Sequence, residues 1–180
     1  VGSEMCIRDS IGPNMPIIVR LAMDEFIGDA GRQLAETVEL CKMLEAAGVD
    51  ALDCGAGLFQ TMSLISPPVY YEKGFMADMT DEIKKAVSIP VIVQGRLQDP
   101  EVAEKVLEEG KADFVAMGRA WIAEPEWVNK VACGDLDGMR RCISCDHCIG
   151  DRIASGNQTL RCTLNAMAGR EHRFLNGYPK

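Results

Sequence analysis

The sequence alternates apolar runs of strand length with amphipathic segments of helical length, and it does so four times. The predicted strands are 15–21, 49–54, 89–94 and 112–118, and the predicted helices are 31–48, 79–87, 99–110 and 124–134. The strands are continuously apolar, as strands of a parallel sheet buried on both faces are. Such alternation indicates an α/β protein in which right-handed crossovers join parallel strands.

Four strand–helix units make half of an eight-stranded barrel, and we expect residues 11–139 to form such a half. A half barrel leaves two open strand edges and an uncovered core. An open doubly wound sheet is the competing architecture, because periodicity alone does not separate the two.

The first ten residues, VGSEMCIRDS, resemble a translated sequencing adapter, so we expect residues 1–10 to be an artefact and Cys6 to belong to no site. Their removal takes away Glu4, Asp9 and Arg8, which moves the net charge from −8 to −7. This acidic balance argues against nucleic acid or an anionic membrane as a partner. No apolar run approaches the ~18 residues of a membrane span.

Eight cysteines could indicate a secreted disulfide scaffold. The long helical patterns and the absence of a secretory segment instead favour a reducing, cytoplasmic location with metal-bound thiols.

Two consecutive predicted strands end in a glycine–arginine pair, Gly95-Arg96 and Gly118-Arg119. A glycine lets the backbone approach a phosphate, and an arginine adds charge and a forked set of donors. Barrels often bind phosphate after their last two strands. The alternative, that the glycines only turn the chain and the arginines pair with acidic residues, is equally open. Arg20 ends the first strand at the same rim, where spacing alone favours a salt bridge.

Cys142, Cys145, Cys148 and Cys162 have the spacing C-x2-C-x2-C-x13-C. Three thiols so close together cannot all form well-shaped disulfides, but four thiolates can hold zinc or a 4Fe–4S cluster. The compact triplet with a remote fourth cysteine favours the cluster, because zinc sites favour two separated pairs. We expect His147 to be a surface residue or a hydrogen-bond donor. Cys41, Cys54 and Cys133 are predicted to be small buried apolar residues.

Together these segments resemble the flavin oxidoreductases in which an old-yellow-enzyme barrel precedes a 4Fe–4S segment, a group that includes dienoyl-CoA reductases, 2-enoate reductases and trimethylamine dehydrogenase. The resemblance rests on PIIVRL, GVDALDCGAG, IPVIVQGRLQDPEVAEKVLEEGKADFVAMGRAWIAEPEWVNKV, CISCDHC and CTLNAMAGRE. It implies that residues 11–139 are the C-terminal half of a TIM (β/α)8 barrel that binds FMN. Residues 140–172 would be the cluster segment, and 173–180 the start of a linker to a nucleotide-binding domain.

The resemblance also implies roles for single residues. Arg20 would reach the pyrimidine edge of the flavin and stabilise negative charge on the reduced ring. Gly95, Arg96, Gly118 and Arg119 would hold the FMN phosphate. Cys142, Cys145, Cys148 and Cys162 would ligate the cluster. The missing first half of the barrel would carry the proton donor, so no catalytic residue is assigned here.

The implied function is that of an FMN- and 4Fe–4S-dependent oxidoreductase fragment that uses NAD(P)H to reduce an activated C=C bond in a small-molecule substrate. FAD and NAD(P)H sites would lie in a missing C-terminal part, and homo-oligomers are compatible with the sequence. Two departures matter: Phe59 stands where dienoyl-CoA reductases have a histidine, and the cysteine spacing leans toward an amine dehydrogenase of the trimethylamine dehydrogenase type. Tyr70 and Tyr71 could line the substrate pocket or pack their own loop.

Two readings without redox chemistry also stay open. One is a zinc-stapled structural or interaction module on a phosphate-binding α/β domain. The other is a barrel enzyme that acts on a sugar phosphate, which leaves the cysteines without a role.

We expect residues 11–180 expressed alone to be inactive and poorly soluble, because half of the barrel core would face water. Size-exclusion chromatography and flavin absorbance measure this. A monodisperse product saturated with FMN would contradict the expectation.

Overall fold

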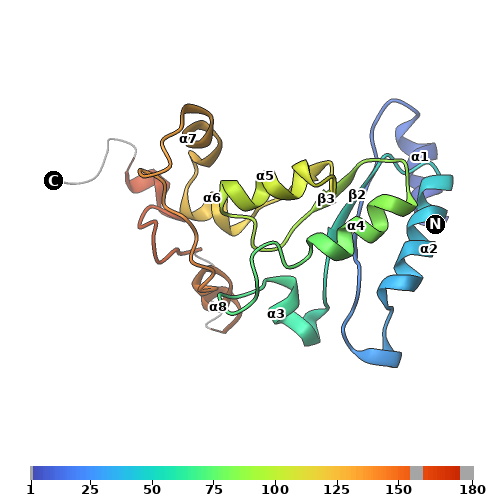
Figure 1. Ribbon diagram of the computed structural model, residues 1–180, viewed down its shortest axis with the longest axis horizontal. Coiled ribbons are helices and arrows are strands. Elements are labelled where there is room, and N and C mark those ends of the chain that lie inside the picture. The colour runs from blue at the N-terminus through green and yellow to red at the C-terminus, as the bar shows by residue number, and fades with distance from the viewer. Residues whose placement is uncertain (1, 155–159, 175–180) are drawn as a thin grey trace.

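The structure is a computed structural model that describes residues 2–154 and 160–174, with the backbone alone described for 151–154. The strands are β1 (Ile18–Ala22), β2 (Ala51–Gly55), β3 (Val91–Val93) and β4 (Phe114–Val115). The helices are α1 (Gly2–Ile11), α2 (Leu34–Ala46), α3 (Met62–Ile65), α4 (Ala77–Ala86), α5 (Pro100–Glu108), α6 (Arg119–Ala123), α7 (Trp127–Cys133) and α8 (His147–Ala154). Three 3-10 turns, η1 (Gly28–Ala30), η2 (Phe59–Thr61) and η3 (Glu171–Arg173), complete the described elements. Figure 1 shows the cysteine segment, orange to red, at the opposite end of the molecule from α1 and α2.

The four strands form one parallel sheet in the order β1-β2-β3-β4. Each strand overlaps a predicted one, and consecutive strands are neighbours, as they are around the wall of a barrel. The prediction of an α/β fold built as a partial barrel is confirmed.

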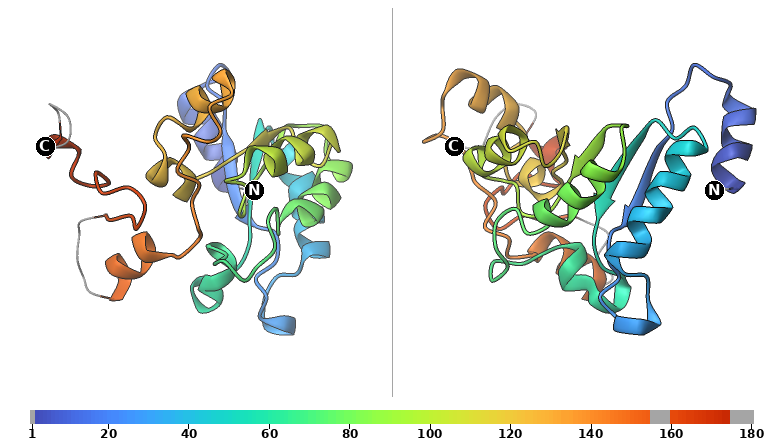
Figure 2. Two further views of the ribbon diagram at one scale, coloured as in Figure 1. Left: turned by 60° about the vertical axis from the view of Figure 1, so that its left-hand side comes forward. Right: turned by 45° about the vertical axis from the view of Figure 1, so that its right-hand side comes forward.

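One face of the sheet is covered by helices α2, α4 and α5, which lie side by side along it (Figure 2). The apolar face of β2 and β3 supplies Leu52, Val91 and Val93, all 0% exposed, and α4 packs Ile83 against them. Each such fully buried aliphatic side chain contributes about 2 kcal/mol to the free energy of unfolding. The helices that cover this face overlap the predicted helices 31–48, 79–87 and 99–110.

The opposite face of the sheet has no cover within the described chain. The parallel register aligns Arg20, Asp53, Ile92 and Phe114 across the four strands on this face. Phe114 is 57% exposed, as is Ile18 on the edge strand. This is the uncovered core expected of a half barrel, because the described helices lie on one side of the sheet only.

Several local features differ from the predictions. Residues 1–10 were expected to be an artefact, but nine of them form helix α1 together with Ile11, and this helix has no buried residue. The segment between β2 and α4 contains η2 and α3, which were not predicted, and neither were α6 and α8. Thr80 is buried within α4, and its hydroxyl donates to the Met76 carbonyl oxygen at 2.9 Å.

The cysteines outside the cluster segment divide into two kinds. Cys41 and Cys54 are buried as predicted, and burial raises their pKa to about 11 and about 12, so both remain neutral thiols. Cys133 is exposed, contrary to the prediction, because the short helix α7 turns it to solvent.

A buried carboxylate fixes where the cysteine segment leaves the barrel. Glu124, at the end of α6, is 1% exposed and accepts from Lys130 Nζ at 2.8 Å and from Arg140 Nη2 at 3.1 Å. Arg140 also donates through Nε to the Ala123 carbonyl oxygen at 2.9 Å. Further along, Asn165 donates to the Ile122 carbonyl oxygen at 2.9 Å. Both arms of the cysteine segment are thus attached to the end of α6.

None of the helices in the described part of the chain combines the length and the apolar character that crossing a bilayer requires.

We predict that Glu124→Gln lowers the free energy of unfolding of the full-length gene product by about 3 kcal/mol at pH 7, because Arg140 and Lys130 lose their anion. Burial by itself would raise the pKa of Glu124, but hydrogen bonds from Lys130 and Arg140 outweigh it and hold the pKa below its ordinary 4.5. The stabilisation is therefore complete above pH 4.5 and is lost as the pH falls through the lower folded-state pKa.

Thermal unfolding of wild type and variant across this pH range is the measurement. The difference between them should shrink with acidification, and a difference that grew would contradict the prediction.

Candidate functional site

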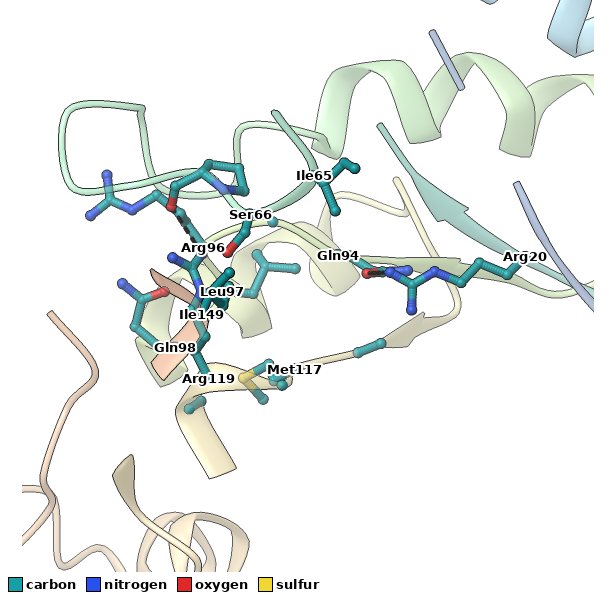
Figure 3. Close-up of a pocket in the computed structure, with 15 residues that line it drawn as sticks. Arg20, Ile65, Ser66, Gln94, Arg96, Leu97, Gln98, Met117, Arg119 and Ile149 are labelled. Carbon is teal, nitrogen blue, oxygen red and sulfur yellow. Dashed lines mark hydrogen bonds between the residues drawn. The ribbon is translucent and has the colours of Figure 1, made fainter. Parts of the chain in front are cut away.

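A cavity of about 350 Å³ lies where the strands of the sheet end. Its wall includes Arg20 from β1, the segment 94–98 after β3 and the segment 116–120 after β4, with Ile65, Ser66, Pro67 and Ile149 closing it. Figure 3 shows Arg20 and Gln94 at one end of this cavity and Arg96, Gln98 and Arg119 gathered at the other. All five residues predicted to bind the cofactor, Arg20, Gly95, Arg96, Gly118 and Arg119, line it.

At one end, Arg20 belongs to a hydrogen-bonded network that joins three neighbouring strands. Its Nη2 donates to Gln94 Oε1 at 2.9 Å, and Gln94 Nε2 donates to Asp53 Oδ1. Arg20 Nη1 also lies 3.8 Å from Asp53 Oδ2. The Arg20 side chain is 63% exposed, so this ion pair contributes little stability and serves mainly to orient the guanidinium. Arg20 therefore forms an ion pair with Asp53 and also lines the cavity, so the two roles predicted for it are compatible.

Sequence reasoning missed Asp53 and Gln94. A signal for Asp53 was available, because it is a charged residue inside an otherwise apolar strand. Its register opposite Arg20 could not be read from the sequence, since that requires the pairing of β1 with β2.

At the other end, two arginines span from a loop to the cysteine turn. Arg96, which is 9% exposed, donates to the Val69 carbonyl oxygen at 2.8 Å and to Ser144 Oγ at 3.4 Å. Arg119 donates to the Pro67 carbonyl oxygen at 2.9 Å and forms an ion pair with Asp146. These contacts use two donors of each guanidinium, which carries five. Each guanidinium therefore has donors that these contacts do not use, and both side chains line the cavity.

The two glycines, equivalent in the sequence pattern, differ in the structure. Gly95 has φ +98°, and a Cβ there would lie 2.9 Å from Met76 Cγ, a core atom. Gly118 has φ −104°, and a Cβ there would meet no atom within 4 Å. Gly95 is thus required by the backbone, whereas at Gly118 the structure leaves open space beside the cavity.

The four predicted metal ligands, Cys142, Cys145, Cys148 and Cys162, line one small second cavity together with Ile122, Ile143, Leu164 and other residues. Ser144 and Asp146, between the first three cysteines, have φ of 52° and 56°, which is rare for residues with a side chain. These left-handed residues curl the backbone so that the triplet faces one space. The predicted donor set is therefore brought together, and His147 is not among the residues around it.

The chemistry of this second cavity suits a soft metal centre, because sulfur donors surround it and apolar side chains line it. The Ser144 amide donates to Cys142 Sγ at 3.4 Å, a contact that stabilises a thiolate. Burial raises the pKa of the Cys142 and Cys148 thiols, a cost that metal ligation would offset. Among the described residues no three acidic, histidine or cysteine side chains already stand at ligating distances.

The aromatic residues of the loop after β2 lie outside both cavities. The Tyr71 hydroxyl lies 3.2 Å from Ser63 Oγ, and its ring packs edge-on against Phe75. Tyr70 is 76% exposed and Phe59 is 74% exposed. Tyr71 thus packs its own loop, whereas Tyr70 and Phe59 present apolar surface to solvent.

Comparison with known proteins gives a consistent result. A family model described as "NADH:flavin oxidoreductase / NADH oxidase family" matches residues 6–137. The chain is 45% identical over 166 residues to the NADH oxidase of Thermoanaerobacter brockii, which covers 92% of the chain and 25% of the relative. It is 32% identical over 182 residues to the cinnamate reductase of Clostridium sporogenes, and this match covers 93% of the chain and 27% of the relative.

A solved structure of histamine dehydrogenase from Rhizobium sp. 4-9 matches with a TM-score of 0.82 and 29% identity, over 92% of this chain and 23% of that one. The chain thus spans about a quarter of the length of the curated relatives it matches.

We predict that Gly95→Ala lowers the free energy of unfolding of the full-length gene product by about 2 kcal/mol, whereas the matched variant Gly118→Ala changes it by less than ~0.5 kcal/mol. The reason is that Gly95 combines a left-handed φ with a close approach to Met76, and Gly118 has neither. Denaturant unfolding followed by circular dichroism measures both. Equal losses for the two variants would contradict the structure.

Proposed function

Because this chain belongs to the NADH:flavin oxidoreductase / NADH oxidase family, we propose that it supplies the FMN-binding half barrel and the cluster-binding segment of a longer oxidoreductase. The observation that carries the proposal is that two cavities meet at Arg119: five residues at three strand ends are part of the lining of the larger one, and four thiols are part of the lining of the smaller. In this proposal residues 11–139 are the half barrel, 140–172 bind a 4Fe–4S cluster, and 173–180, mostly outside the described residues, begin a linker.

The arginine end of the larger cavity would hold the FMN phosphate. Arg96 and Arg119 are fixed by loop carbonyl groups on one side, so their guanidinium planes are oriented before a ligand arrives. The left-handed Gly95 brings the main chain against the cavity without a side chain in the way. Gly118, whose Cα faces open space, leaves room beside Arg119.

The opposite end would hold the flavin ring, and there the chain supplies a cation. Gln94 and Asp53 orient Arg20, which then offers a fixed positive charge where reduction of the flavin adds negative charge. When bound together, FMN and the cluster would supply exchange between two-electron and one-electron transfer. The role of this chain is to bind, orient and balance charge.

For the reaction we propose NAD(P)H-dependent reduction of an activated C=C bond in a small molecule, in the cytoplasm. The support is the 32% identity to a cinnamate reductase across nearly the whole chain. FAD and NAD(P)H sites would then lie in parts of the protein beyond this chain.

A second candidate is an amine dehydrogenase. It is favoured by the match to a histamine dehydrogenase structure and by the C-x2-C-x2-C spacing. Phe59 stands where dienoyl-CoA reductases have a histidine. This chain therefore lacks their proton relay at that position.

The test is anaerobic isolation of the full-length protein. We expect about four irons, about four acid-labile sulfides and one FMN per chain, with no stoichiometric zinc. Cys145→Ser should lose most of the iron, whereas Cys133→Ser should keep it, because Cys133 is an exposed thiol that lines neither cavity. A colourless zinc protein would instead support the structural module.

Substrate assays then separate the two reactions. Oxidation of NAD(P)H on addition of cinnamate supports the reductase, and reduction of an artificial acceptor by an amine supports the dehydrogenase. Wild-type protein with neither iron nor flavin overturns both.

A further inference from the structure

Arg119 lines both the larger cavity and the thiol cavity. Its side chain is 15% exposed, and its two terminal nitrogens face different partners. Nη2 donates to the Pro67 carbonyl oxygen at 2.9 Å, on the side of the larger cavity, and Nη1 pairs with Asp146. One cation therefore stands between the two proposed cofactor sites.

Asp146 lies between Cys145 and Cys148, and it lines the thiol cavity with them. Its left-handed backbone, with φ 56°, turns the carboxylate toward Arg119. The same oxygen, Oδ1, also accepts from Ser66 Oγ at 3.3 Å. The Asp146 side chain is 26% exposed, so solvent screens this ion pair less than it screens a surface pair.

The neighbouring arginine makes a contact of the same form but without an opposing charge. Arg96 donates to Ser144 Oγ at 3.4 Å, and Gln98 donates to the same oxygen at 3.2 Å. Ser144 is 1% exposed. The cysteine turn is thus held to the larger cavity at two points, and the Arg119–Asp146 contact is the one that carries charge.

Resting on the function proposed above, we propose that Asp146 is a positioning residue whose pairing with Arg119 joins the phosphate end of the FMN cavity to the cluster and sets the charge at both. Asp146 compensates the arginine next to four thiolate ligands. Without Asp146, an uncompensated cation beside the cluster favours its reduced, more negative form. Without Arg119, an uncompensated carboxylate disfavours that form, and the phosphate also loses a donor.

The experiment uses the full-length protein, purified without oxygen and loaded with iron and FMN. The midpoint potential of the cluster is measured by a redox titration followed by electron paramagnetic resonance, alongside iron and FMN content. Asp146→Asn should shift the potential upward with FMN retained. Arg119→Gln should shift it downward with FMN content reduced at least several-fold.

Two further variants separate charge from folding. Arg119→Lys keeps the cation and should keep the potential close to that of wild type. The double variant Asp146→Asn with Arg119→Gln removes both charges and should return the potential toward the wild-type value. The matched control is Asp81→Asn, which breaks an ion pair with Lys85 at a similar exposure of 22% on α4, away from both cavities, and should shift nothing.

Shifts of the same sign in the two single variants, or none in either, overturn the proposal while the loaded wild type leaves the proposed function standing. Loss of iron in both single variants and in the double variant overturns it as well, because a balanced pair must restore what an unbalanced charge disrupts. Wild type that contains neither iron nor flavin overturns the proposed function itself.

Discussion

The parallel register of four short strands determines which side chains meet at the candidate site. Parallel strands end at the same edge of a sheet, so the residues that follow β3 and β4 lie beside those at the end of β1. Arg20, Asp53 and Gln94 come from three strands yet form one hydrogen-bonded network. A shift of one residue in the pairing of β1 with β2 would turn Arg20 toward the helices and dissolve that network.

The second organising feature is a set of charges that fastens the cysteine segment to the barrel. Glu124 holds Arg140 where the segment begins, and Asp99 and Glu101 at the start of α5 hold Arg141 beside it. Arg119 then holds Asp146 within the cysteine triplet. The segment has little apolar surface buried in the main core. These polar contacts therefore hold the segment in place, as apolar packing holds the helices against the sheet.

The sequence was sufficient for the elements whose signal is local. Apolar runs located the four strands of the described sheet, and the predicted helix 99–110 contains α5. The paired Gly-Arg turns pointed to the right edge of the sheet. Features set by distant contacts were not readable. Gly95 and Gly118 look alike in the sequence, and only the neighbouring Met76 separates them. The left-handed Ser144 and Asp146 were equally hidden, since neither residue type requires that conformation.

Helix α6 has five residues, yet its first residue is Arg119 and its last carbonyl groups, on Ile122 and Ala123, receive Asn165 and Arg140. Because α6 is a short helix with contacts at both of its ends, the groups at the two ends would move together with it. A small tilt of α6 would move the Arg119 guanidinium, which lines both cavities, together with both arms of the cysteine segment. Substitutions that alter the packing of α6 against Trp127 would therefore change the geometry of both cavities at once.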